Sequence, residues 1–277
     1  MIPLERRRRI LSVLEERGTA RISELCELLD VSHMTVRRDI GALEELGRVA
    51  SVPGGVSLPA RLVLDQSHAV KEGIRQEEKT AIAQQAASMV GPGELVLLDA
   101  GTTTLALARA LADRADLTFI TNDLAIATYL SEHAASEELY LAAGKVDRAN
   151  LSTEGAQTAA AIAEYNIDIA FLSTSSFDLR GLSVPTEAKK VVKRAIVENS
   201  TRTVLLTDSS KYGKVADLRA ARLSELDAVI TDSGLPEPAR TAIAQQDVPL
   251  VLVDVPSPRS AASPSASPQT PTAKVQP

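Results

Sequence analysis

The sequence contains very few cysteines and histidines. Cys26 is the single cysteine among 277 residues, so no disulfide can form within the chain. Such a sequence is typical of a reducing compartment, and we expect Cys26 to be a buried thiol. The three histidines, His33, His68 and His133, are far apart and have no cysteine or histidine at metal-ligand spacing. We therefore expect a cytoplasmic protein with no metal and no cofactor.

The chain also lacks a long hydrophobic run. No stretch of about eighteen apolar residues is uninterrupted, so we expect no membrane-spanning helix. Residues 1–18 include basic residues but no small-residue cleavage site after an apolar stretch, so we expect no secretory signal. Hydrophobic residues make up 44% of the chain, which is enough for a sizeable core, and its length suggests about two domains.

An excess of positive charge is absent as well. The formal net charge is −6, which argues against a uniformly basic nucleic-acid-binding surface but allows a local basic patch. Residues 1–57 contain nine arginines and nine acidic residues, so this segment is neutral. Any binding of DNA must depend on where the charges lie. The run Arg6 to Arg9 can be a solvated helix face, or one or two of its members can touch the DNA backbone.

Residues 1–57 have the pattern of three helices followed by a β-hairpin. Apolar residues at helical spacing predict a helix over residues 4–17, which ends at Gly18. Ser23 is a suitable N-cap for a second helix. Two short β-rich pieces around two glycines in residues 48–58 indicate a hairpin. We interpret this order as a helix–turn–helix with a wing.

The third helix begins within the sequence VSHMTVRRDI, residues 31–40. Ser32 can cap it, while Val31 and Val36 have the spacing of a hydrophobic staple. The face opposite its apolar stripe carries Arg38 near the N-terminus and a small residue, Gly41, in the middle. Glycine inside a helix costs about 1 kcal/mol relative to alanine, which makes sense where the surface must approach a partner closely.

Two interpretations of the adjacent arginines are open, a solvated helix face and a helix shaped for the DNA major groove. The capping serine, the staple, the preceding short helix and the following hairpin together favour the groove. We therefore predict that the protein binds double-stranded DNA through residues of the turn, the third helix and the start of the wing, namely Ser32, His33, Met34, Thr35, Arg37, Arg38 and Arg48.

The segment VSHMTVRRDIGALEELG resembles the helix–turn–helix of the DeoR family of bacterial transcription regulators, whose pattern runs roughly VSxxTIRRDLxxLExxG. The GntR and LacI groups share fragments of this pattern. The wing departs from the family in one respect. Where the family usually has an arginine followed by His-Gly-Gly-Ala, this chain has Ser51, and Pro53 before the two glycines. One cation expected in the wing is therefore missing.

From residue 76 the pattern changes to apolar, β-rich runs that alternate with helical segments. Continuous apolar strands separated by helices predict a mostly parallel sheet in an α/β domain over residues 76–255. We interpret residues 58–75 as a polar linker. Residues 256–277 are rich in proline, serine and alanine, and we expect a disordered tail. The expected strands lie at residues 94–98, 117–121, 138–144, 167–173, 203–207, 228–231 and 249–255.

Small polar residues follow four of these strands. In open parallel sheets, ligands bind beyond the carboxyl ends of the strands. Gly101 allows a close backbone approach, the helix that follows presents its N–H groups there, and Lys211 can add a positive charge. Each polar residue alone is more often a helix cap, but together they predict an anion site. The strand ends are Asp99 to Thr104, Thr121 to Asp123, Ser173 to Ser176, and Asp208 to Lys211.

The segments LLDAGTTTLALARAL, FITNDLAIA, EAKKVVKRAI and LLTDSSKYG resemble the effector domain of the same family, in the family's order. The resemblance implies a sensor of phosphorylated sugars with a fold related to ribose-5-phosphate isomerase and CoA transferases. It departs from the family at Ala143-Gly144 and in the loop Ser173 to Asp178. The effector-binding residues it implies are Gly101, Thr102, Thr103, Thr121, Asn122, Glu187, Lys190, Asp208 and Lys211, to which the strand-end pattern adds Asp99.

Together these patterns predict a transcription regulator, and we expect a repressor of a carbohydrate operon that responds to a phosphorylated sugar or polyol. A single winged head contacts few bases, so we expect an oligomer, either a dimer or a tetramer. An isomerase-like enzyme is the alternative, but the loop that would hold its acids offers only Asp178. A purely structural interaction module is a second alternative, which two separate polar sites disfavour.

Overall fold

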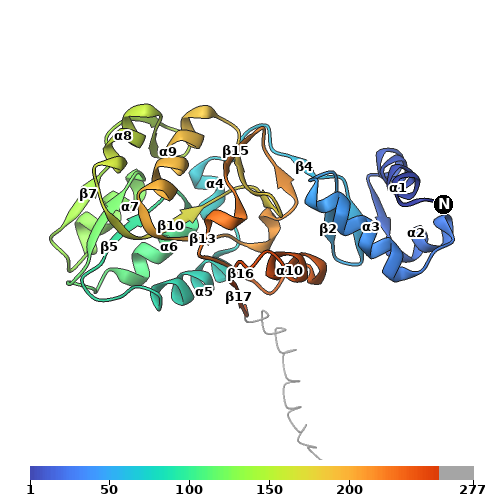
Figure 1. Cartoon of the computed structure of the whole chain (residues 1–277). Coiled ribbons are helices and arrows are strands. Elements are labelled where there is room, and N and C mark those ends of the chain that lie inside the picture. The colour runs from blue at the N-terminus through green and yellow to red at the C-terminus, as the bar shows by residue number, and fades with distance from the viewer. Residues whose placement is uncertain (256–277) are drawn as a thin grey trace, which may run out of the picture.

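The computed structural model describes residues 1–255, and the expected disordered tail lies outside them. A small N-terminal head of three helices projects from a larger α/β domain (Figure 1). The fold class is therefore the expected one, a winged helix–turn–helix joined to a parallel-sheet domain. Among the described residues, no helix has the length and hydrophobicity that a membrane crossing requires.

The head packs three helices on a small antiparallel sheet with the strand order β1-β3-β2. Gly18 ends the first helix as expected, with a positive φ of 76°. Ser32 caps the third helix by accepting a hydrogen bond from the Thr35 N–H. The elements are α1 (Pro3–Arg17), β1 (Thr19–Arg21), α2 (Ile22–Leu29), α3 (His33–Glu45), β2 (Ala50–Val52) and β3 (Gly55–Ser57).

Two local expectations for α2 were wrong. Ser23 does not cap this helix, because the helix already begins at Ile22 with Arg21 in the capping position. The Glu24 carboxylate accepts a hydrogen bond from the Arg21 N–H and so performs part of the capping that Ser23 was expected to perform. Cys26 is half-buried against the edge of the head's core and is not fully buried.

The segment that joins the head to the α/β domain contains regular structure. It includes β4 (Ala60–Arg61) and α4 (His68–Glu72). Strand β4 pairs in parallel with β14 (Lys214–Val215), so residues far apart in the sequence lie side by side where the head meets the α/β domain. Residues 62–67, between β4 and α4, form neither a helix nor a strand.

All seven expected strands enter one sheet, and every pair of neighbouring strands in it is parallel. The order β17-β16-β13-β10-β5-β6-β7 places the first strand, β5, in the interior. The next two strands along the chain add to one side of β5, and the later four add to its other side. The order in which strands are added therefore reverses between β5 and β10. The strands are β5 (Leu95–Leu98), β6 (Thr118–Thr121), β7 (Leu139–Leu141), β10 (Ile167–Ser173), β13 (Ser200–Leu206), β16 (Ala228–Asp232) and β17 (Leu250–Val253).

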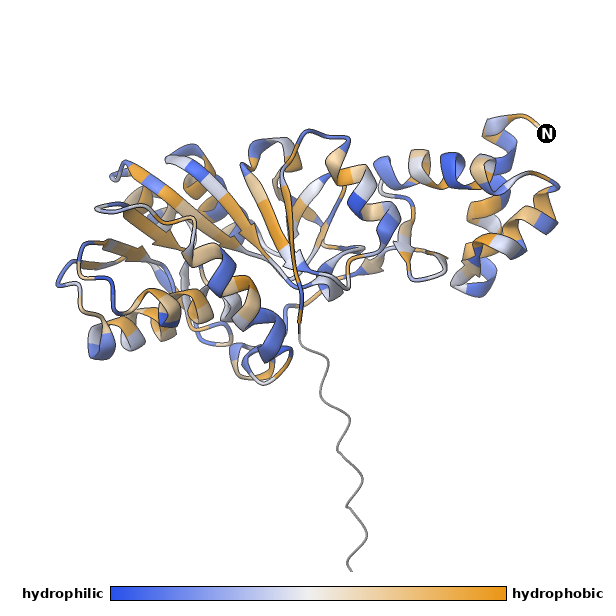
Figure 2. Cartoon of the chain, turned by 90° about the horizontal axis from the view of Figure 1, so that it is seen from below, coloured by the Kyte–Doolittle hydropathy of each residue, from blue (hydrophilic) through white to orange (hydrophobic). Residues whose placement is uncertain are grey.

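Helices cover both faces of this sheet, which explains why its strands are mostly apolar (Figure 2). In β5, Val96 and Leu98 pack under α5, α6 and α7, whereas Leu97 points to the opposite face, under α8, α9 and α10. The helices are α5 (Gln76–Ala87), α6 (Thr102–Leu111), α7 (Leu124–His133), α8 (Ala156–Ala163), α9 (Glu187–Glu198) and α10 (Glu237–Ala244).

Shorter elements surround the carboxyl edge of the sheet. They form a two-stranded antiparallel sheet, β8-β9, and a three-stranded antiparallel sheet, β11-β12-β15. Their bounds are β8 (Lys145–Asp147), β9 (Ser152–Glu154), β11 (Phe177–Asp178), β12 (Gly181–Val184), β15 (Leu218–Ala221), and the 3₁₀ helices η1 (Ser209–Lys211) and η2 (Leu223–Glu225).

Candidate DNA-binding helix and ligand pocket

Helix α3 presents an exposed, partly cationic face. Arg37 and Arg38 are exposed, and neither guanidinium forms an ion pair or hydrogen bond with another residue of the described chain. Met34, one turn earlier, is 73% exposed. A Cβ added at Gly41 would have no atom within 4 Å, so the middle of this face is slender and open. This arrangement is the one that a helix needs to enter the major groove.

A buried carboxylate holds α1 against α3. Asp39, whose side chain is 2% exposed, accepts hydrogen bonds from Arg6 Nε at 2.6 Å and Arg7 Nε at 3.1 Å. Arg8 and Arg9 are exposed. Half of the arginine run is therefore tied to the fold of the head, and only its second half matches the solvated-face interpretation.

A pocket lies at the carboxyl ends of β5, β6, β10 and β13, where the direction of the sheet reverses. Parallel α/β sheets bind ligands at such a position. Most of the strand-end residues expected there line it, and the segment after β4, helices α4 and α9, and the loop before β9 complete its wall. The expected residues that line the pocket are Asp99, Gly101, Thr102, Thr103, Asn122, Asp208 and Lys211.

The loop before α6 is held rigidly in this pocket. The Ala100 N–H donates to the Asn122 Oδ1 at 3.0 Å, and the Gly101 N–H donates to the Asp123 Oδ2 at 3.0 Å. A Cβ at Gly101 would lie 2.3 Å from the Ser173 Oγ, so the two strand ends approach closely only because residue 101 is glycine. Helix α6 then begins at Thr102, with its first N–H groups free of intrahelical partners, as an anion site requires.

Five lysines line the pocket, and most of them are tied to carboxylates. Lys193 donates to the Asp99 Oδ2 at 2.5 Å and to the Ser173 carbonyl at 2.6 Å. Lys211 lies 3.8 Å from the Asp208 Oδ2. Burial lowers the pKa of Lys79 to about 8, and the nearby charge of Lys211 acts in the same direction. The pocket therefore gathers five lysine side chains, and Lys79 loses its proton more readily than an exposed lysine does.

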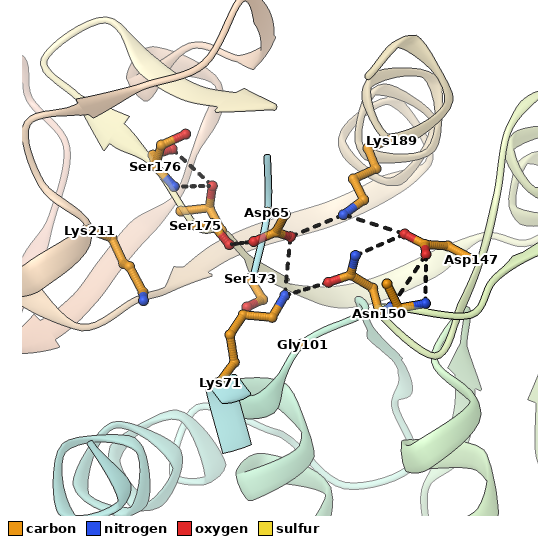
Figure 3. A network of polar contacts seen from close by, with 12 residues as sticks. Asp65, Lys71, Gly101, Asp147, Asn150, Ser173, Ser175, Ser176, Lys189 and Lys211 are labelled. Carbon is orange, nitrogen blue, oxygen red and sulfur yellow. Dashed lines mark hydrogen bonds and ion pairs between the residues drawn. The ribbon is translucent and has the colours of Figure 1, made fainter. Parts of the chain in front are cut away.

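Asp65 reaches into this pocket from the irregular segment after β4 (Figure 3). Its carboxylate accepts hydrogen bonds from the Ser175 Oγ at 2.6 Å, Lys189 Nζ at 3.0 Å and Lys71 Nζ at 3.1 Å. Lys71 also donates to the Asn150 Oδ1 at 2.7 Å. Burial alone would raise the pKa of Asp65, but the two lysines and the serine outweigh it and lower that pKa to about 2. Asp65 is therefore ionised at neutral pH.

Three expected residues do not line the pocket. Thr121 is fully buried, and its hydroxyl donates to the Leu98 carbonyl at 2.6 Å, which ties β6 to β5. Glu187 and Lys190 pair with each other at 3.2 Å, and Glu187 is exposed. Successive residues of a helix are rotated by about 100°, so the positions of α9 that point into the pocket are Lys189 and Lys193.

Three residues of the pocket were not predicted from the sequence, namely Asp65, Lys71 and Lys79, which precede the first strand of the sheet. Their side chains come from the linker, α4 and α5, and no strand-end pattern marks them. Lys189 and Lys193 did leave a signal, because they are four residues apart and share a helix face next to the buried Val192.

The α/β domain contacts helix α3 through a buried carboxylate. Glu44, 2% exposed near the end of α3, accepts hydrogen bonds from the Ser51 N–H at 2.7 Å, the Ser51 Oγ at 2.9 Å and the Tyr212 hydroxyl at 2.8 Å. Burial, together with the Glu44 charge, raises the pKa of Tyr212 far above its ordinary value. Ser51, the departure from the family's wing pattern, thus has a structural partner. Tyr212 directly follows Lys211, which lines the pocket.

Comparisons with known proteins agree with both halves of this structure. A family model described as the DeoR-like helix-turn-helix domain matches residues 6–61, and one described as the DeoR C terminal sensor domain matches residues 74–233. The uncharacterized HTH-type transcriptional regulator YgbI of Escherichia coli (strain K12) is 46% identical over 252 residues, which are 91% of this chain and 98% of that protein. The glycerol-3-phosphate regulon repressor of the same organism is 30% identical over 90% of this chain and 98% of its own length.

Among solved structures, ribose 5-phosphate isomerase A from Methanocaldococcus jannaschii aligns with 48% of this chain and 53% of its own. The two are 19% identical, and the TM-score of 0.35 is too low to support a conclusion about activity. The two family matches and the relatives, in contrast, cover nearly the whole described structure. The family predicted from the sequence is confirmed, and the chain belongs to the DeoR family of helix-turn-helix transcriptional regulators.

Proposed function

We propose that this regulator represses a carbohydrate-metabolism operon and that a phosphorylated sugar or polyol in the pocket changes its affinity for the operator. One observation carries the proposal. Asp208 and Lys211 line the pocket, while the next residue, Tyr212, bonds to Glu44 on the recognition helix. A ligand that moves the Asp208–Lys211 loop can therefore act on the head through one short, continuous segment.

The chemistry of the pocket suits a phosphate group with a polyol chain. The N-terminus of α6 offers free N–H groups and the hydroxyls of Thr102 and Thr103, while Lys211 supplies positive charge. Asn122, Asn150 and Ser173 provide neutral polar groups for hydroxyls. The name of one relative, the glycerol-3-phosphate regulon repressor, is consistent with a phosphorylated polyol as effector.

In this proposal α3 contacts base edges and phosphates through the exposed residues predicted from the sequence. Two heads in an oligomer would bind half-sites about one helical turn apart or a multiple of it, which supplies the affinity that one head lacks. A ligand that weakens operator binding tenfold must bind the two states of the protein with a difference of about 1.4 kcal/mol.

We propose no catalytic role for the pocket. The acid that the isomerase alternative would use, Asp178, is engaged by Arg180, whose Nη2 and Nε donate to the Asp178 Oδ2 at 2.6 Å and 2.9 Å. The Arg180 N–H donates to the other oxygen of the same carboxylate at 2.8 Å. Asp178 is also not one of the residues that line the pocket.

The test measures operator binding by fluorescence anisotropy, with DNA from upstream of the gene and its neighbours. The protein is titrated with a panel of phosphorylated sugars and polyols and with their unphosphorylated analogues. We expect at least one phosphorylated compound to shift operator affinity tenfold or more and its analogue to have no effect. A response to unphosphorylated compounds alone would refute the anion site. Aldose–ketose isomerisation by the same preparation would show that the pocket is catalytic.

A further inference from the structure

Asp65 is an unusual member of the ligand pocket, because it belongs to the segment that connects the two domains. Groups from three separate elements bind its carboxylate: Lys71 from α4, Ser175 from the loop after β10, and Lys189 from α9. Its side chain is only 12% exposed. Residues 62–67 around it have no helix or strand that would require this position. The three donors thus form a ready-made binding site for one oxyanion.

The charges of the pocket limit what can enter while Asp65 stays. Five lysines line the pocket, together with four acidic residues, of which Glu154 has a partner outside the pocket in Lys145. Within the lining the lysines then face Asp65, Asp99 and Asp208. Beyond it, the charge of Arg75, 3.7 Å from Asp208, offsets that of Asp147, 3.7 Å from Lys189, which leaves two positive charges. That excess matches one phosphate dianion at α6. A second anionic group of the ligand can find compensating charge only at the lysines that hold Asp65.

We propose that Lys71, Lys189 and Ser175 form a second oxyanion subsite, which the chain's own Asp65 occupies until an anionic group of the effector replaces it. This inference rests on the proposed function and narrows the class of effector. The effector is a sugar derivative with an oxyanion at each end, either a sugar acid phosphate or a bisphosphate. A carboxylate that exchanges for the Asp65 carboxylate leaves the charge balance of the pocket unchanged.

The exchange also explains how binding of the ligand in the pocket would affect the position of the head. Asp65 follows β4 by four residues, and β4 pairs with β14 next to Tyr212 and the Glu44 contact. The Leu62 N–H donates to the Val215 carbonyl at 2.9 Å and the Ala60 N–H to the Gly213 carbonyl at 3.0 Å. Release of Asp65 frees the end of this short connection, on which the position of the head depends.

The test asks whether removal of the Asp65 side chain creates an extra anion site. Inorganic phosphate and acetate are titrated separately, by isothermal calorimetry, into the full-length wild type, Asp65→Ala and Asp217→Ala. Asp217 is the control, because it also forms an ion pair with another residue but does not line the pocket. Its side chain is 61% exposed, and its partner Arg61 belongs to the same linker as Asp65. Thermal unfolding of each variant verifies that it is folded.

We expect Asp65→Ala to bind one more oxyanion per chain than the wild type, or to bind acetate at least about tenfold more tightly. Asp217→Ala should behave like the wild type. The gain should disappear in the double variant Asp65→Ala/Lys189→Met, which lacks the cation of the subsite. Acetate binding would indicate a sugar acid, whereas binding of phosphate alone would indicate a bisphosphate.

Two other outcomes overturn the inference and separate it from the proposed function. The second subsite does not exist if the wild type binds phosphate but Asp65→Ala shows no additional oxyanion binding. The same conclusion follows if the additional binding persists in Asp65→Ala/Lys189→Met, and in both cases the phosphate site at α6 stands. If Asp65→Ala misfolds, Asp65→Asn is measured in its place, since it keeps the shape of the side chain and removes the charge. If no form binds phosphate and no sugar phosphate alters operator binding, the proposed function fails as well.

Discussion

The Tyr212–Glu44 hydrogen bond offers the sharpest test of communication between the two domains. Tyr212→Phe removes one hydroxyl and leaves the ring, which packs edge-on against Phe177 with the ring centroids 5.3 Å apart. Glu44 keeps its two hydrogen bonds from Ser51. The substitution therefore weakens the contact between the domains without a large change in packing or in the recognition helix.

The expected magnitude follows from the charge and burial of the acceptor. A hydrogen bond to a charged group contributes about 1.5–3 kcal/mol, and Glu44 and Tyr212 are both buried, so solvent cannot replace the lost donor. We expect Tyr212→Phe to lower the free energy of unfolding by about 1.5–3 kcal/mol, measured by urea denaturation. It should also reduce the effect of the effector on operator affinity about tenfold, in the anisotropy assay.

Tyr140→Phe is the matched control. The Tyr140 hydroxyl also donates to a carboxylate, the Glu138 Oε2 at 2.7 Å, but on the exposed side of β7 and far from the head. Solvent replaces that bond, so we expect a loss of less than about 0.5 kcal/mol and an unchanged response to the effector. Equal effects of the two substitutions would refute the view that the Glu44 contact couples the domains.

Three further predictions test the two sites. Arg38→Ala should weaken operator binding and reduce the slope of log affinity against log salt by about 0.9 if its guanidinium contacts a phosphate; an unchanged affinity would show that α3 is not the recognition helix. Gly41→Ala should stabilise the DNA-free protein by about 1 kcal/mol yet weaken operator binding. Gly101→Ala should destabilise the protein, because the added Cβ would clash with Ser173, and thermal unfolding distinguishes the two variants. Because the pKa of Lys79 is about 8, deprotonation above that pH removes a positive charge, so phosphate affinity should fall as pH rises through 8, and Lys79→Gln should abolish that fall in calorimetry.

Much of the fold was predictable because its signals are local. The strands are apolar on both faces, and the turn before α3 carries its own serine cap, so short windows of sequence identify these elements. The cap of α2 was mispredicted, because the helix begins before Ser23, at Ile22, and the Glu24 carboxylate accepts the N–H of the capping residue Arg21. Helix existence is more robust than the position of a helix end.

Sequence patterns were enough to identify the family, the exposed arginines of α3 and the strand-end half of the pocket. Parallel strands carry their following loops to one edge, so polar residues after several strands must meet there. The packing of distant elements, in contrast, brings Asp65 and Lys71 into the pocket and Tyr212 against Glu44. More than a hundred positions separate the residues in the contacts Asp65–Ser175, Asp65–Lys189 and Tyr212–Glu44. These contacts depend on how the elements pack, which no local pattern records.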